Sequence, residues 1–163
     1  MLVTSVIDIQ INGFSSEVPD KRQIREWAHA VFSLLNRRLV PLTVRIVDER
    51  EIRDLNRLYR GKDQITNVLS FAYEPLPNVD VDLLGDIVIC GSVVTKEAKD
   101  QEKLFMDHWA HIVIHGTLHL FGYDHETDDE AVTMERLEIK LLNGLGFANP
   151  YYHEIVNFDK VHG

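Results

Sequence analysis

The alternation of apolar and polar positions predicts four strands. It covers residues 2–11, which are rich in β-branched side chains, and shorter strand-like runs cover 42–47, 65–71 and 83–90. Helical spacing separates the first three runs, whereas only a loop separates the last two. The sequence therefore predicts a sheet that mixes crossover connections with one adjacent pair of strands.

Helix-start and helix-stop residues occupy the intervals between these runs. Asp48 and Glu51 predict a capping box for a helix that stops near Gly61, because glycine adopts the left-handed conformation that ends a helix. We also expect Ser92 to cap a helix that runs toward Lys103.

The C-terminal third predicts two longer helices. Helical spacing continues over about 104–121, where Gly122 ends the pattern, and Thr127 with Glu130 predicts another capping box. The apolar stripe of the following helix consists of Met134, Leu137, Leu141 and Leu142. Together these patterns predict an α+β fold in which about five helices pack on a mixed four-stranded sheet.

Length and composition are those of an ordinary globular protein. The chain has 163 residues, of which 45% are hydrophobic and 26% charged, so we expect one domain over 1–163. Cys90 is the single cysteine, and the N-terminus lacks the basic start of a secretory signal. No apolar run approaches the roughly 20 residues of a membrane span. We therefore expect a cytoplasmic protein with no membrane partner.

The charge is unevenly distributed along the chain. The net charge of −9 argues, by itself, against a nucleic-acid partner. Residues 37–62, however, hold eight basic and four acidic residues and so carry +4, which leaves −13 for the remainder. The local field of this segment, and not the whole-chain charge, decides which partner the protein attracts.

Five of the eight histidines fall between positions 108 and 125. His115 and His119 are four residues apart on a predicted helix, so both rings can reach one ion. Gly122 allows the chain to turn, which positions His125 to supply a third nitrogen. Three nitrogens leave a fourth position open on Zn²⁺, as in catalytic sites. The spacing therefore predicts one zinc ion on His115, His119 and His125.

Neighbouring polar residues leave alternatives open. His108 and His111 lie one or two turns before the ligands. Each either hydrogen-bonds a ligand histidine, faces the substrate or is merely polar. Asp124 either orients a ligand histidine or hydrogen-bonds within the turn. We keep His111 and Asp124 as candidates for residues that support the ligands.

The spacing His-x-x-x-His-x-x-Gly-x-x-His matches the metzincin zinc proteases. Those proteases place a glutamate, the general base, directly after the first histidine, whereas this chain has Gly116 there. Gly116 belongs to the apolar side of the helix, where it would allow close packing. The chain therefore keeps the metal geometry without the protease base, which points to another substrate.

The segment HGTLHLFGYDH at 115–125 resembles the signature of the YbeY family, the bacterial metal-dependent endoribonucleases of ribosomal RNA maturation. YRGKD at 59–63, TNVLSF at 66–71 and GDI at 85–87 are similar to further motifs of this family. The resemblance covers about 40–152.

This resemblance implies a zincin-like fold, zinc on the three histidines and cleavage of single-stranded RNA, with ribosomal RNA and the small ribosomal subunit as partners and no DNA. It also implies a catalytic arginine at Arg60. The general base and the attacking group, water or the ribose 2′-hydroxyl, stay open. Two alternatives are a zinc hydrolase of amides or esters, with Glu126 or Asp124 as base, and a non-catalytic ribosome-binding protein with structural zinc.

Four arginines predict a basic stripe on the helix that ends near Gly61. Arg50, Arg53, Arg57 and Arg60 are spaced 3, 4 and 3 apart, so they share one face that could follow a phosphate backbone. The alternative is a solvated face balanced by Glu49, Glu51 and Asp54. Because Arg57 and Arg60 have no evident acidic partner on the helix, a functional role is favoured there. The RNA-binding candidates are Arg53, Arg57 and Arg60.

Overall fold

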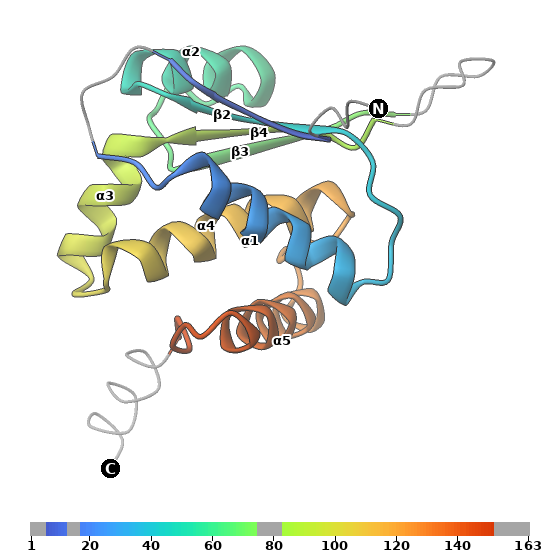
Figure 1. Ribbon diagram of the computed structural model, residues 1–163. Helices are drawn as coiled ribbons and strands as arrows, with labels where there is room; N and C mark the ends of the chain where they lie inside the picture. The colour runs from blue at the N-terminus through green and yellow to red at the C-terminus, as the bar shows by residue number, and fades with distance from the viewer. Residues whose placement is uncertain (1–5, 13–16, 75–82, 152–163) are drawn as a thin grey trace.

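The computed structural model describes residues 6–12, 17–74 and 83–151. Strands and helices follow in the predicted order (Figure 1). They are β1 (Ile7–Ile11), α1 (Lys21–Leu34), β2 (Leu42–Val47), α2 (Glu49–Arg60), β3 (Val68–Ala72), β4 (Gly85–Cys90), α3 (Gly91–Asp100), α4 (Phe105–Leu120) and α5 (Asp128–Gly144). Within these ranges no helix has the length and apolar character that a membrane crossing requires.

The sheet has the strand order β1-β2-β4-β3. β1, β2 and β4 are parallel, and β3 pairs antiparallel with β4. The predicted α+β fold, with five helices on a mixed four-stranded sheet, is confirmed. β4 is a central strand, whereas β3 lies at the edge of the sheet, where it borders the candidate site described below.

Three strands begin later than predicted. β4 begins at Gly85 and not at Leu83, and β3 ends one residue later than predicted, at Ala72. β1 covers only the second half of 2–11, and residues 2–5 of that range lie outside the described chain. β3 begins at Val68 and not at Ile65, because its partner β4 ends at Cys90, whose N–H donates to the carbonyl of Asn67 at 2.9 Å.

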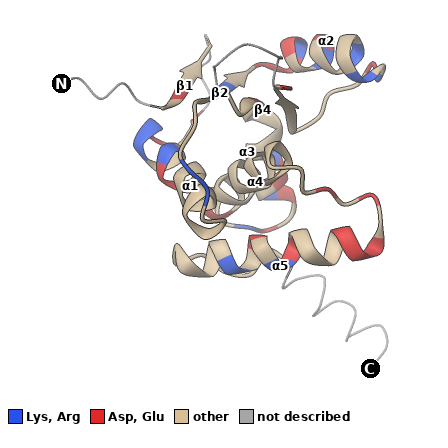
Figure 2. Ribbon diagram, turned by 90° about the vertical axis from the view of Figure 1, so that its right-hand side faces the viewer, with Lys and Arg blue, Asp and Glu red and all other residues tan. Residues whose placement is uncertain are grey.

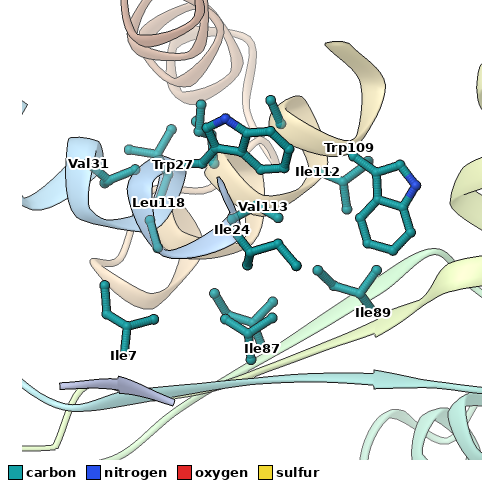
Figure 3. Packing of buried hydrophobic residues seen from close by; sticks show 14 of the residues in the cluster. Ile7, Ile24, Trp27, Val31, Ile87, Ile89, Trp109, Ile112, Val113 and Leu118 are labelled. Atoms are coloured by element: carbon teal, nitrogen blue, oxygen red, sulfur yellow. The ribbon is translucent and has the colours of Figure 1, made fainter. Parts of the chain in front are cut away.

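The helices cover both faces of the sheet. α2 lies on one face, while α1, α3, α4 and α5 lie on the other (Figure 1). α4 is central to this second layer, and its Trp109 and Val113 are fully buried. Figure 3 shows these side chains above Ile87 and Ile89 of β4. Burial of each such side chain contributes about 1.5–3 kcal/mol, so α4 is fixed firmly against the sheet.

The predicted helix ends are mostly where cap chemistry places them. The Asp48 carboxylate accepts the Glu51 N–H at 2.8 Å, and Gly61, with φ of 68°, ends α2. The expected cap at Ser92 is wrong, because β4 runs directly into α3 and Cys90 takes the cap position. Ser92 lies inside the first turn, where its hydroxyl donates to Glu49 at 3.1 Å.

Gly116 brings α4 into close contact with the sheet. A Cβ at this position would lie 2.9 Å from Cγ2 of Ile87 and 3.3 Å from Cγ2 of Val68. The Ser70 hydroxyl of β3 donates to the Gly116 carbonyl at 2.9 Å. The predicted packing role of Gly116 is confirmed, and this contact holds the neighbouring His115 beside β3.

Candidate metal centre

Three histidines from the end of α4 and the following turn come together. The Nε2 atoms of His115 and His119 lie 3.0 Å apart. Gly122, with φ of 94°, turns the chain so that the His125 ring stacks on His115 with centroids 5.5 Å apart. One nitrogen from each ring lies within 4.8 Å of the others. The structure thus assembles the predicted ligand set.

This donor set fits a zinc ion. Tetrahedral zinc bound to nitrogen at about 2.0–2.1 Å holds its ligand nitrogens roughly 3.4 Å apart, close to the separation of the His115 and His119 nitrogens. Burial lowers the pKa of His119, as do charges on His115 and His125, and these effects outweigh the opposing effect of Asp124. A lowered pKa favours the neutral imidazole, which is the form that binds a metal.

The three histidines open into a cleft of about 670 Å³. β3 lines this cleft with Val68, Ser70 and Ala72, and Arg60 lines it from the end of α2. The Arg60 guanidinium donates to the Ser70 carbonyl at 2.8 Å, and its carbon lies 5.7 Å from the centre of the Phe71 ring. Arg60 is therefore held in the same cleft as the three histidines.

Arg53 and Arg57 line a separate hollow, of about 490 Å³, on α2. Arg53 pairs with Asp63 at 2.9 Å, and this hydrogen bond, with the arginine charge, lowers the pKa of the aspartate. Arg57 pairs with Asp54 at 3.3 Å, so the expectation that Arg57 lacks an acidic partner on its helix is wrong. The prediction overlooked that Asp54 lies three residues before Arg57, and residues three apart on a helix are neighbours. RNA binding by Arg53 and Arg57 stays a prediction.

A family model described as endoribonuclease YbeY matches residues 9–146. The chain belongs to the YbeY family. The match extends upstream of the motifs that first suggested it and includes the end of β1 and the whole of α1. The solution structure of TM1509 from Thermotoga maritima is similar to this family member, with a TM-score of 0.54 and 27% sequence identity. That similarity covers 85% of this chain and 91% of the Thermotoga maritima chain.

In this YbeY family member, the sequence analysis missed a buried carboxylate behind the ligands. Glu138 of α5 is 1% exposed, and its Oε2 lies 3.4 Å from His115 Nδ1. Burial by itself raises the pKa of Glu138, but hydrogen bonds from His111 and His115 outweigh burial and hold the pKa at about 2. A signal was present, since Glu138 lies four residues after Met134 and three before Leu141, and so interrupts an apolar stripe.

The other polar candidates of this region take different places. His111 hydrogen-bonds Glu138, and its ring also meets the His115 ring in an edge contact with centroids 6.1 Å apart. Asp124 accepts the His125 N–H at 2.8 Å. Of the two alternatives for Asp124, this is the hydrogen bond within the turn. An orienting role of Asp124 toward a ligand ring stays a prediction. His108 is buried, and its Nε2 lies 3.0 Å from Oε1 of Glu97 in α3.

Proposed function

We propose that this protein is a cytoplasmic, zinc-dependent endoribonuclease that cuts single-stranded RNA during ribosomal RNA maturation, with the small ribosomal subunit as its partner. Membership of the YbeY endoribonuclease family supports the reaction class. The observation that carries the proposal is the cleft shared by the three histidines and Arg60. A zinc ion held there would supply a Lewis acid toward a phosphoryl oxygen.

Arg60 is suited to bind the phosphate at the cleaved bond. A guanidinium carries five N–H donors, and the bond to Ser70 engages one of the Arg60 nitrogens. That bond and the contact with Phe71 fix the group in advance, so little reorganisation is needed when charge develops on the phosphate.

Aromatic rings next to Arg60 favour an unpaired strand as the substrate. Tyr59 is 63% exposed, and its ring meets that of Phe71 at a centroid distance of 5.3 Å. Unpaired bases stack on such exposed rings, whereas the bases of a duplex are already stacked on each other. The chain therefore offers a phosphate contact at Arg60 in the cleft and a base contact at the exposed ring of its neighbour Tyr59.

Two observations disfavour the amide or ester alternative. Gly116, the position of the protease base, is packed against Ile87 and has no space for a carboxylate. In many complexes an extended peptide pairs with the free edge of a sheet. Here the Ser70 carbonyl of the edge strand β3 already accepts a bond from Arg60. In its favour, Glu126 and Asp124, the two candidate bases of this alternative, both line the cleft.

Incubation of zinc-loaded and chelator-treated protein with single-stranded ribosomal RNA tests the proposed function. We expect cleavage only with zinc, and a loss of about 100-fold or more in kcat for Arg60→Ala with zinc still bound. Arg22→Ala, which changes an exposed arginine of α1, is the matched control. Equal cleavage by the chelated protein would refute the proposal. A 2′,3′-cyclic phosphate on the products would assign the attack to the ribose hydroxyl.

A further inference from the structure

Glu138 connects three parts of the chain behind the metal centre. It projects from α5, the two histidines that it contacts belong to α4, and Tyr151 follows α5. The Tyr151 hydroxyl donates to Glu138 Oε1 at 2.9 Å, while both histidines contact Oε2. Each carboxylate oxygen thus has a hydrogen-bond donor, which offsets the cost of burying the charge.

The two nitrogens of His115 point to different partners. Nε2 lies 3.0 Å from His119 Nε2 in the metal centre, and Nδ1 lies 3.4 Å from Glu138 Oε2. A neutral imidazole carries its proton on one nitrogen only. If the carboxylate holds that proton on Nδ1, the lone pair of Nε2 is free to bind the ion, and the ring is held in the orientation that binding requires.

We propose that Glu138 is a positioning residue for the metal ligand His115, and that His111 and Tyr151 hold Glu138 in place. This proposal rests on the metal centre and is independent of the RNA substrate. It also gives the end of α5 and the segment up to Tyr151 a role in the site, although Tyr151 lies beyond the part of the chain that matches the family model.

The alternative is a second ion bound by the same atoms, since His111, His115 and Glu138 place three ligand atoms within 4.8 Å of one another. Burial favours a hydrogen-bonded network. The side chains of His111 and Glu138 are 12% and 1% exposed, and the Tyr151 hydroxyl already lies against both of them. His115, His119 and His125, by contrast, line the open cleft. The number of ions bound per chain separates the two arrangements.

Zinc affinity, measured on the full chain by competition with a chromogenic chelator, tests the proposal. Glu138→Gln keeps the shape of the side chain, and we expect it to weaken zinc binding about 10- to 100-fold. We also expect a changed visible spectrum when cobalt(II) replaces zinc, because that spectrum reports ligand geometry. Glu97→Gln is the matched control, since Glu97 contacts another histidine of α4, His108, at 3.0 Å. This control is expected to keep the zinc affinity and the cobalt spectrum of the wild type.

Tyr151→Phe provides a second variant that removes only one hydroxyl, and we expect a smaller loss of affinity, of a few-fold. Circular dichroism of the metal-free variants shows whether each is folded. If Glu138→Gln does not fold, the zinc affinity of Tyr151→Phe decides the proposal. Wild-type affinity in the folded variants would overturn the proposal. The proposal would also be overturned if the wild-type chain bound two ions and Glu138→Gln lost only one of them. A wild-type protein that binds no zinc would refute the metal centre itself, and with it this role.

Discussion

Gly116 shows how one missing side chain determines both packing and chemistry. The Cβ of any other residue would lie 2.9 Å from Ile87 Cγ2, closer than carbon atoms approach without displacement. The position that carries the general base in the related protease pattern is therefore part of the core in this protein. The histidines of the same helix keep the metal geometry because they line the cleft and are not part of this contact.

Gly116→Ala is expected to destabilise the protein by about 1–3 kcal/mol, because the added methyl group overpacks the contact between α4 and the sheet. Urea unfolding measures the change. Gly144→Ala is the control, because a Cβ at Gly144 meets nothing within 4 Å, and there we expect stabilisation of about 0.4–1 kcal/mol. Equal effects of the two substitutions would contradict the packing role.

His119→Ala is expected to abolish tight zinc binding, since it removes one of three ligands and leaves the other two too few to hold the ion. Metal analysis after dialysis measures the bound zinc. His29→Ala changes an exposed histidine of α1 and should retain it. Full zinc retention in His119→Ala would remove the central claim about this site.

Contacts between a carboxylate and a histidine connect α4 to two neighbouring helices. α5 supplies Glu138 to the histidines of α4, and α3 supplies Glu97 to His108 of the same helix. Burial by itself raises the pKa of Glu97, but hydrogen bonds from His108 and Asn67 outweigh burial and lower it overall. Asn67 lies in the loop before β3 and lines the cleft. Its hydrogen bond to Glu97 therefore connects the packing of α3 on α4 to that loop.

Acid should weaken the contact between α3 and α4. Because the folded pKa of Glu97 lies below its ordinary value of 4.5, its contribution to stability is complete above that value. The contribution is lost as the pH falls through the folded pKa. Urea unfolding between neutral and acid pH should therefore show that Glu97→Gln is less stable than wild type near pH 7. This difference in stability should shrink when the pH falls below the ordinary pKa of glutamate. A stability difference that does not change with pH would contradict the role of Glu97.

On the scale of the whole molecule, acidic and basic side chains are distributed unevenly. Figure 2 shows both basic and acidic residues along α2, and acidic residues at the start of α5. Asp128, Asp129 and Glu130 occupy that first turn, where acidic side chains favour the helix. A net charge of −9 is thus compatible with RNA binding, because Arg60 and Lys62, at the end of the basic segment 37–62, line the cleft.

The salt dependence of RNA binding tests the hollow on α2 that Arg53 and Arg57 line. If Arg53 or Arg57 contacts a phosphate, its replacement by alanine should reduce the slope of log affinity against log salt by about 0.7, the value for single strands. Fluorescence anisotropy with a labelled single strand measures this slope. An unchanged slope would limit these arginines to their ion pairs with Asp63 and Asp54.

The sequence by itself determined the features that depend on neighbours along the chain. Apolar periodicity predicted the order of strands and helices, and cap residues such as Asp48 and Gly61 predicted where α2 ends. The spacing of the histidines with Gly122 predicted the grouping of the ligands, since one helix turn and one sharp bend are sufficient to bring them together.

Only the tertiary structure decided the contacts between distant elements. It placed β3 at the edge of the sheet, selected Arg60 and not Arg57 for the cleft, and brought Glu138 to His115 across 23 positions of sequence. The physical reason is that such contacts depend on how whole helices pack against one sheet. No local periodicity encodes the distance between a carboxylate of α5 and an imidazole of α4.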